Sequence, residues 1–223
     1  MIELAVLDIA GTTVEEHGAV YAALEQAATA AGGTPTAADV RRWMGAGKRE
    51  AITGLVTETT GRAPTAEVVE QGLTDFRARL ADAYAATPPT PLPGVPEAIT
   101  ALRGAGVRVA LTTGFDRQVV SGLLETLGWD DSVVDAVVSV DDVSAGRPAP
   151  YLIFRAMERT GVRDVRSVLT AGDTTRDLEA GSNAGAGYVV GVLTGGHSAT
   201  DLGAARHTHM LPSVAAIPAL LGI

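Results

Sequence analysis

Three aspartates and one arginine are the residues of this chain whose spacing points to chemistry. Asp8 follows an apolar run at the amino end, and Asp173 and Asp177 follow a later apolar run as an Asp-x-x-x-Asp pair. Arg147 lies in a Gly-Arg-Pro segment after a third apolar run. Carboxylates act as nucleophiles and as ligands of hard divalent cations, and a guanidinium binds phosphoryl oxygens. Together these residues predict phosphoryl chemistry.

Each of these side chains fits a role that phosphoryl transfer requires. A carboxylate that faces a dianionic phosphoryl group is repelled unless a cation intervenes. Asp8 is the candidate nucleophile, and Asp8 and Asp173 are expected to bind Mg²⁺ together with the backbone carbonyl of Ala10. Asp177 lies one helical turn after Asp173, so we expect it to hold a metal-bound water or to support Asp173. Arg147 is expected to bind the phosphoryl oxygens.

Small and hydroxylated residues near two predicted strand ends complete the expected phosphate site. Gly11 permits a sharp turn that can direct backbone N–H groups towards an anion, and Thr12 adds a hydroxyl. Thr112, Thr113 and the amide of Gly114 offer further neutral donors. Thr113 is favoured over Thr112 because it lies further past the strand. A turn-capping aspartate is the alternative for one short motif, but not for a whole set at one sheet edge.

The hydrophobic pattern predicts an α/β fold that brings these residues together. Residues 1–7 form an apolar run typical of a buried strand, and strand and helix patterns alternate from residue 92 onwards. Further strands are expected at 107–111, 133–140, 167–171, 187–192 and 208–211. We therefore expect a doubly wound, mainly parallel sheet, in which ligands bind at the carboxyl ends of the strands.

The residues between the first strand and the rest of the sheet show helical patterns and no strand signal. Helices are expected over 19–31, 39–44, 48–59 and 66–86, followed by a stiff proline-rich connector at 88–91. We expect a catalytic core of residues 1–15 and 91–223 and an inserted helical cap domain of residues 16–90. The apolar helix over residues 19–31 is a candidate homodimer contact.

Composition limits the partners and the compartment. The formal net charge of −9 argues against nucleic acid, which requires basic patches. The absence of cysteine excludes disulfides, thiolate catalysis and zinc–cysteine sites. Glu3 and Asp8 interrupt the amino-terminal apolar run, which therefore does not resemble a signal peptide, and no run is long enough to cross a membrane. We expect a soluble cytoplasmic protein whose partner is a small phosphonate or phosphate.

The motifs resemble those of the haloacid dehalogenase superfamily, and within it the phosphonatase (phosphonoacetaldehyde hydrolase) branch. Asp8-Ile-Ala-Gly-Thr is similar to the Asp-x-Ala-Gly-Thr of that branch, whereas ordinary phosphatases of the superfamily carry Asp-x-Asp-Gly-Thr. Arg147 in Gly-Arg-Pro-x-Pro resembles the phosphonatase form of a motif that usually carries lysine. The resemblance covers the whole core. It implies that Asp8 attacks phosphorus and that water hydrolyses the resulting aspartyl-phosphate.

Ala10 and Lys48 indicate which bond is cleaved. Ordinary phosphatases place a proton-transferring aspartate at the position of Ala10, and alanine cannot replace it. Cleavage of a C–P bond needs an electron sink instead, which a lysine imine of a neighbouring aldehyde provides. Lys48, in Met-Gly-Ala-Gly-Lys, is similar to the imine-forming lysine of the phosphonatases. Such a lysine needs a pKa lowered by roughly two to three units, and burial is the expected cause.

Several positions depart from the phosphonatase pattern. Ala51, Gly18 and Phe115 stand where those enzymes have histidine, cysteine and tyrosine. His17 is either a replacement polar group or an ordinary surface histidine, and His197 is a candidate for the rim of the site. The sequence favours a Mg²⁺-dependent hydrolase of phosphonoacetaldehyde or a related 2-oxo-phosphonate. A phosphatase for a small phosphate ester, with the lysine only binding substrate, and a non-catalytic phosphate-binding protein are the alternatives.

Overall fold

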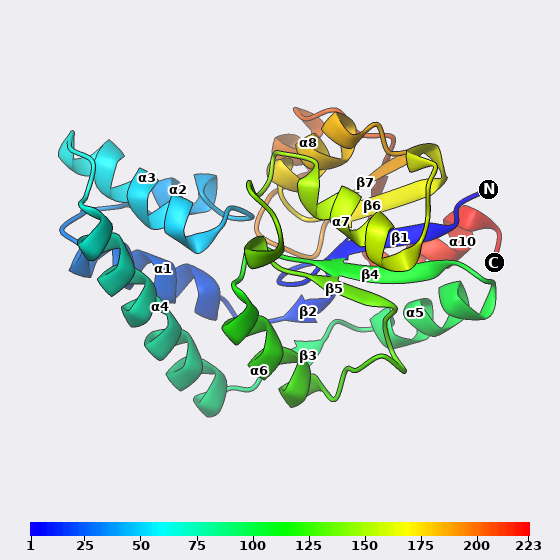
Figure 1. Cartoon of the computed structure of the whole chain (residues 1–223), viewed down its shortest axis with the longest axis horizontal. Helices are drawn as coiled ribbons and strands as arrows, with labels where there is room; N and C mark the ends of the chain where they lie inside the picture. Colours follow the sequence, from blue (N-terminus) through cyan, green and yellow to red (C-terminus); the bar gives the residue numbers. More distant parts are fainter.

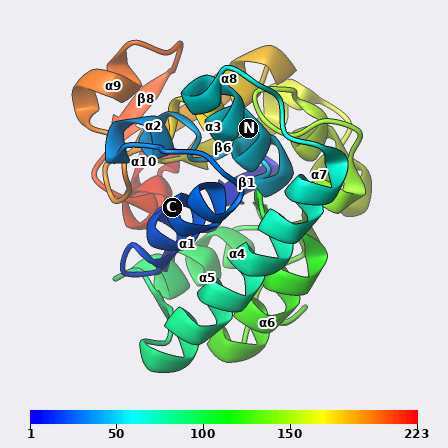
Figure 2. The same ribbon diagram turned by 90° about the vertical axis from the view of Figure 1, so that its left-hand side faces the viewer.

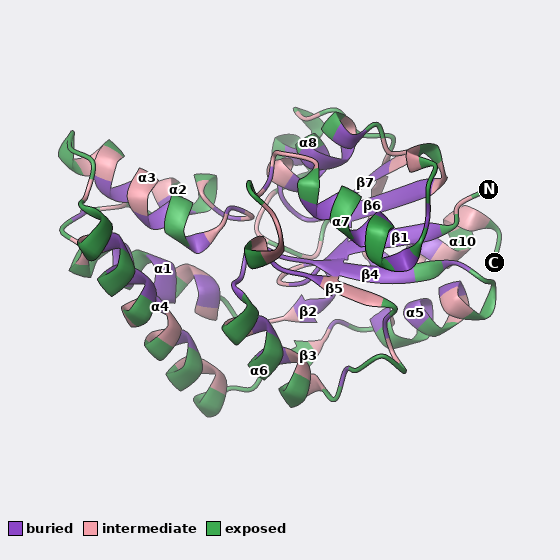
Figure 3. Ribbon diagram, viewed as in Figure 1, coloured by how far each residue is buried: buried purple, intermediate pink, exposed green.

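Short runs of Val, Leu and Ala form the strands of a six-stranded sheet. In the computed structural model, which describes residues 1–223, these strands are β1 (Leu4–Asp8), β4 (Arg108–Thr112), β5 (Ala136–Val138), β6 (Val168–Gly172), β7 (Tyr188–Val192) and β8 (His209–Leu211). The order across the sheet is β5-β4-β1-β6-β7-β8, and every neighbouring pair is parallel. Strands β1 and β6 are buried along their whole length (Figure 3), as continuous apolar runs require. The predicted doubly wound sheet is confirmed.

Helices cover both faces of this sheet (Figure 1). They are α5 (Val95–Gly104), α6 (Arg117–Leu127), α7 (Tyr151–Thr160), α8 (Thr175–Ala184) and α10 (Ile217–Leu221). On one face, Leu152 of α7 and Ala180 of α8 pack in a cluster with Val6 of β1. On the other, Ile99 of α5 packs in a larger cluster with Leu7. The sheet is therefore a two-sided core that holds its strand ends in fixed positions.

The strand order reverses beside β1, which has β4 on one side and β6 on the other. The register places Asp8 opposite Thr112 of β4 and Leu7 opposite Ala171 of β6. The carboxyl ends of these three strands therefore meet at one edge. Open α/β sheets bind their ligands at such a switch point.

A helical insertion lies beyond this edge. It comprises α1 (Ala19–Ala30), α2 (Ala37–Arg42), α3 (Lys48–Thr60) and α4 (Ala66–Ala86), and Figure 2 looks directly onto it. Helix α1 packs on α3 and α4 through an apolar face that includes Val20 and Leu24. That face is covered within the chain, so a homodimer through this helix stays a prediction. No helix of the structure combines the length and apolarity needed to cross a bilayer.

Two short strands connect the helical insertion to the core. Strands β2 (Val14–Glu15) and β3 (Thr90–Pro91) pair antiparallel, so the proline-rich connector ends in a strand that the sequence analysis did not predict. Two-residue strands show no usable periodicity. The predicted domain boundaries fall at the end of β2 and inside β3, and the division itself stays a prediction. A short helix, α9 (Ala199–Gly203), was also not predicted, and β5 is shorter than expected.

Candidate active site

The three aspartates named by the sequence meet at the sheet edge. Asp8 ends β1, Asp173 directly follows β6, and Asp177 lies in the first turn of α8. All three are buried, and one carboxylate oxygen from each lies within 4.8 Å of the others. Hard oxygen donors of this kind suit Mg²⁺. The donor set therefore fits the expected divalent cation.

Without a bound cation, burial and mutual repulsion disfavour the charged forms of these carboxylates. Burial raises the pKa of Asp8, although the guanidinium of Arg147 opposes this shift. Burial also raises the pKa of Asp173, and the charge of Asp8 adds to the effect. A bound divalent cation would offset both the burial and the repulsion.

Arg147 connects the candidate nucleophile to Asp177. Its Nη1 lies 2.6 Å from Asp8 Oδ1 as an ion pair, although that nitrogen makes no aligned hydrogen bond. Its Nε lies 2.9 Å from Asp177 Oδ1. Its Nη2 donates to the carbonyl and hydroxyl oxygens of Thr112, at 3.0 and 2.8 Å. Thr112 thus holds the arginine, and it does not line the cavity as Thr113 does.

Asp177 also fixes the start of α8. Its Oδ2 accepts hydrogen bonds from the backbone N–H and the hydroxyl of Thr174, at 3.1 and 2.5 Å, as half of a capping box. Its Oδ1 faces Arg147. Both oxygens therefore have protein partners, and Asp177 holds Arg147 in place. Its expected support of a metal-bound water stays a prediction.

The turn after Asp8 is closed by hydrogen bonds of its own backbone. The N–H of Gly11 donates to the carbonyl of Val14 at 2.9 Å, and the expected role of this turn in binding an anion stays a prediction. Gly11 has a φ of 79°, and a Cβ there would lie 2.7 Å from Asp173 Oδ2. The hydroxyl of Thr12 donates to Asp173 Oδ1 at 2.8 Å. The glycine and the threonine therefore position Asp173.

Thr113 and Gly114, the two candidate phosphate donors after β4, line the cavity that contains Asp8 and Arg147. The hydroxyl oxygen of Thr113 accepts from the N–H of Phe115 at 3.1 Å, so its own proton stays available to a ligand. Ala10 also lines this cavity. Their roles as ligands stay predictions.

Lys48 is the first residue of α3 and is buried in the same cavity. Its Nζ lies 5.2 Å from the ring centre of Phe115 and 5.9 Å from that of Phe76. Burial lowers the pKa of Lys48 to about 8, against the opposing charges of Asp8 and Glu16. The expected burial and its direction are confirmed. An amine with a pKa of 8 is about one-fifth neutral at pH 7.4, against about one part in a thousand for an ordinary lysine.

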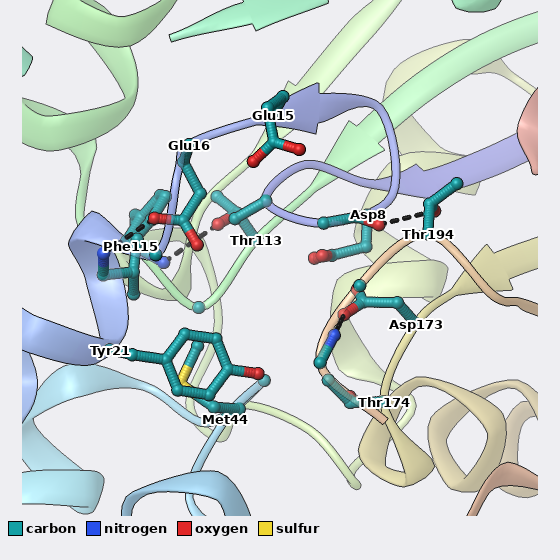
Figure 4. Close-up of a pocket in the computed structure, with 18 of the residues that line it drawn as sticks. Asp8, Glu15, Glu16, Tyr21, Met44, Thr113, Phe115, Asp173, Thr174 and Thr194 are labelled. Carbon is teal, nitrogen blue, oxygen red and sulfur yellow. Dashed lines mark hydrogen bonds between the residues drawn. The ribbon is translucent and has the colours of Figure 1, made fainter. Parts of the chain in front are cut away.

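The cavity has a volume of about 230 Å³ and is lined by both the core and the helical insertion. Figure 4 shows Glu16, Tyr21 and Met44 on the insertion side, and Asp8 and Asp173 on the core side. Glu16 and Tyr21 are not expected as site residues from the sequence pattern. Their burial depends on how the insertion packs, which no local pattern reveals.

A glycine pair separates Tyr21 from Asp173. The N–H of Gly196 donates to Asp173 Oδ2 at 3.1 Å, and a Cβ on Gly196 would lie 1.6 Å from the Tyr21 hydroxyl oxygen. A Cβ on Gly195 would collide with Asp173 itself. The Tyr21 hydroxyl is buried without a hydrogen-bond partner, and burial raises its pKa to about 12. It is therefore a protonated donor facing the cavity.

The two candidate histidines lie outside the cavity lining. His197 Nδ1 is 3.3 Å from the N–H of Thr175, and its Nε2 is 3.3 Å from the carbonyl of Arg41. It thus bridges the core and the helical insertion. His17 is exposed, with a φ of 54°, and its backbone N–H donates to Glu15.

Comparison with known proteins agrees with this geometry. The family model for haloacid dehalogenase-like hydrolases matches residues 2–185. The chain belongs to this family. It is 31% identical over 209 residues to the phosphonoacetaldehyde hydrolase of Bacillus cereus. The aligned region covers 87% of this chain and 76% of that protein. The resemblance to the phosphonatases is thereby confirmed.

Solved structures share the fold of this hydrolase. A hydrolase from Pseudomonas syringae has a TM-score of 0.87 at 22% identity, with 99% of each chain covered. A phosphonoacetaldehyde hydrolase-like protein from Oleispira antarctica has a TM-score of 0.82 at 22% identity, covering 99% of this chain and 91% of that one. Structures described as phosphoglycolate phosphatases share the fold as well, so the fold does not identify the substrate.

Proposed function

We propose that this hydrolase cleaves the C–P bond of phosphonoacetaldehyde or a related 2-oxo-phosphonate, with Mg²⁺ as its cofactor. The observation that carries the proposal is the burial of Lys48 beside Asp8, at a site where Ala10 offers no proton donor. The name of the Bacillus cereus relative supports it.

The basic residues of the chain add an independent argument. Lysine and arginine total 17, and Lys48 is the single lysine. Every other cation is an arginine, which binds anions at least as well as lysine but has no nucleophilic amine. The chain therefore places its one amine side chain in the cavity that holds the candidate nucleophile. Amine chemistry explains that placement better than charge alone.

The proposed reaction uses two nucleophiles of this chain. Lys48 condenses with the aldehyde, and Asp8 attacks phosphorus while Arg147 holds its carboxylate in place. The electrons of the C–P bond move into the iminium, and an enamine leaves. Water hydrolyses the aspartyl-phosphate on Asp8, while the enamine takes up a proton and is hydrolysed to acetaldehyde and free Lys48.

The metal and the neutral donors serve the phosphoryl group. Asp8, Asp173 and the carbonyl of Ala10 would hold Mg²⁺, which when bound neutralises charge between the carboxylates and the phosphoryl oxygens. Thr113 donates its hydroxyl to the same oxygens. Figure 4 shows the core side of the cavity on which this group would rest.

Turnover of phosphonoacetaldehyde, measured by the appearance of both acetaldehyde and phosphate, tests the proposal directly. Asp8→Asn should abolish turnover and still bind inorganic phosphate. Borohydride added together with the substrate should give a covalent adduct on Lys48 in the wild type and none in Lys48→Arg. Wild-type protein that releases no acetaldehyde would reject the assignment.

A phosphatase for a small phosphate ester is the second candidate. The positive charge of Lys48 in the cavity also suits the binding of an anionic ester. In that case Lys48→Arg should weaken binding and leave most of the rate, and no aldehyde should be trapped. Ala10→Asp should then raise ester hydrolysis, because it restores an acid for the leaving group.

A further inference from the structure

Glu16 is a buried acid for which the proposed reaction has so far no role. It directly follows β2, and its side chain points into the cavity (Figure 4). Only 7% of the residue is exposed. Its Oε2 accepts a hydrogen bond from the N–H of Val20 at 2.7 Å, while Oε1 has no partner within the protein. Buried carboxylates usually have partners for both oxygens, so the free one is available to a ligand.

Glu16 and Lys48 act on each other across the same cavity. The charge of Glu16 raises the pKa of Lys48, and the charge of Lys48 lowers that of Glu16. Burial outweighs this attraction and raises the pKa of Glu16 overall, with Glu15 adding to the shift and His17 opposing it. A buried carboxyl and a buried amine are thereby brought towards similar proton affinities, which favours transfer between them.

The other groups that line the cavity are less suited to proton transfer at the lysine. Glu15 is one of them, but it is half-exposed and its Oε1 accepts from the N–H of His17 at 2.8 Å. Ala10 and Ala51 carry no titratable group. Asp8 and Asp173 serve the phosphoryl side of the cavity, and the hydroxyl of Tyr21 retains its proton because burial raises its pKa. Imine formation nevertheless requires a proton acceptor at the amine and a donor at the departing oxygen.

We propose that Glu16 is the acid–base residue for imine formation at Lys48, taking a proton from the ammonium and returning it to the carbonyl-derived oxygen. This inference rests on the proposed function, because it assumes that Lys48 reacts with an aldehyde.

The step balances without an external reagent. The Glu16 carboxylate accepts one proton from the Lys48 ammonium, and the free amine adds to the carbonyl carbon to give a carbinolamine after an internal proton shift. Glu16 then protonates the hydroxyl of that carbinolamine. The C–O bond breaks, water leaves, and the nitrogen lone pair forms the iminium. Glu16 returns to its carboxylate form, and the net products are one iminium and one water.

Reductive trapping of acetaldehyde isolates this step from phosphoryl transfer. Acetaldehyde contains no phosphorus, so it reports on imine formation alone, and cyanoborohydride converts each imine into a stable ethyl adduct. Because Lys48 is the single lysine, adducts on the intact chain are limited to Lys48 and the amino terminus, which peptide mass analysis separates. The rate of adduct formation on Lys48 is the measurement.

Glu16→Gln keeps the size of the side chain and an oxygen for the Val20 N–H, and it removes proton transfer. We expect trapping on Lys48 to slow by roughly 10²- to 10⁴-fold, the usual contribution of general acid–base catalysis. Added formate should restore part of the rate, which a merely structural role would not allow. Glu15→Gln is the matched control, because it removes the same charge from a half-exposed carboxylate that lines the same cavity and accepts from the N–H of His17. Its charge acts on Glu16 only at a distance, so trapping in this variant should stay within about threefold of the wild-type rate.

The outcomes separate the two proposals. If wild-type protein and Glu16→Gln trap acetaldehyde equally fast, Glu16 is not the acid–base residue, while the imine at Lys48 survives. If the wild type traps no aldehyde on Lys48, both proposals fail. Unchanged binding of inorganic phosphate and an unchanged thermal unfolding curve for Glu16→Gln would show that the variant is folded, so that a slow rate counts in favour of Glu16.

Discussion

At the scale of single residues, Lys48 shows how burial changes the proton affinity of an ordinary side chain. Its ammonium is placed among aromatic rings and away from water, so burial lowers its pKa to about 8. The carboxylates of Asp8 and Glu16 oppose this shift without cancelling it. The environment that lowers the pKa of the amine also makes its charged form costly to bury.

The reactive form of Lys48 should appear in the pH dependence of turnover. In Glu16→Gln no side chain takes the proton of Lys48, so a rise in pH must remove it, and kcat/KM for phosphonoacetaldehyde should rise about tenfold per unit below pH 8. In the wild type Glu16 takes and returns that proton, so kcat/KM should instead fall above about pH 8, where the pair has lost it. Steady-state rates across this range, with phosphate release as the signal, check the prediction. A profile of the Glu16→Gln variant that is flat between pH 6 and 9 would contradict a neutral amine as the nucleophile.

The burial of Lys48 should also reduce stability. A lowered pKa means that the folded state disfavours the ammonium, so the cost is complete below about pH 8 and disappears above the ordinary value of 10.5. Lys48→Met should therefore raise the free energy of unfolding at pH 7 by roughly 3 kcal/mol, at ~1.36 kcal/mol per pKa unit. Denaturant unfolding measures this gain, which should shrink as the pH rises from 8 towards 10.5. Equal stability at pH 7 would show that the ammonium is well solvated.

At the scale of elements, the turn between β1 and β2 aligns the ends of the two strands that carry the candidate metal ligands Asp8 and Asp173. Gly11 brings the backbone of this turn against Asp173 at the end of β6, and Thr12 fixes the same carboxylate by a hydrogen bond. The hydroxyl of Thr194 donates to the Gly11 carbonyl at 2.6 Å from the loop after β7. These contacts thus connect the loops that follow β1, β6 and β7.

Gly11→Ala should abolish most activity by moving Asp173. Its Cβ would lie 2.7 Å from Asp173 Oδ2, and its φ of 79° is strained for alanine. Gly18→Ala is the matched control, because Gly18 has a φ of 76° and a Cβ added there would meet no atom within 4 Å. Both variants should lose roughly 1 kcal/mol of stability from backbone strain. Only Gly11→Ala should lose Mg²⁺ affinity by titration calorimetry; equal losses would assign the effect to strain alone.

Much of this edge could be predicted from the sequence, and the reasons are local. Asp8, Thr113 and Asp173 could be placed because apolar runs end just before them and parallel strands share an edge. The direction of the Gly11 N–H could not be predicted, because it depends on a hydrogen bond to the Val14 carbonyl within a tight turn. The burial of Glu16 depends on packing between segments far apart in the sequence, which periodicity does not encode.

At the scale of the whole molecule, the cavity exists only while the helical insertion rests on the core. One buried apolar cluster includes Leu24 and Phe76 of the insertion together with Leu7 and Phe115 of the core. A Cβ on Gly114 would lie 2.5 Å from the carbonyl oxygen of Ala46, so the two parts are in close contact beside Lys48. The ribbon of β2 and β3 is the covalent connection between them, and we propose that it acts as the hinge.

A second contact holds the insertion closed on the side of α6. Arg77 of α4 lies 2.8 Å from Asp116, which also accepts from the N–H of Val119 at the start of α6. Arg79, two residues further along α4, pairs with Asp75 on its own helix and with Gln26 of α1. Arg77 therefore pairs with a residue of the core, whereas Arg79 pairs only with residues of the insertion.

Arg77→Met should favour the open form, whereas Arg79→Met should not. Loss of a partly exposed ion pair is worth ~1 kcal/mol, which corresponds to a roughly fivefold change in the ratio of open to closed molecules. We expect a larger radius of gyration by solution scattering and faster amide hydrogen exchange at residues 44–48 in Arg77→Met, with KM raised more than kcat is lowered. Phosphate binding should reverse the scattering change, because the ligand stabilises the closed cavity. Identical scattering and exchange in the two variants would show that the Arg77–Asp116 pair does not control closure.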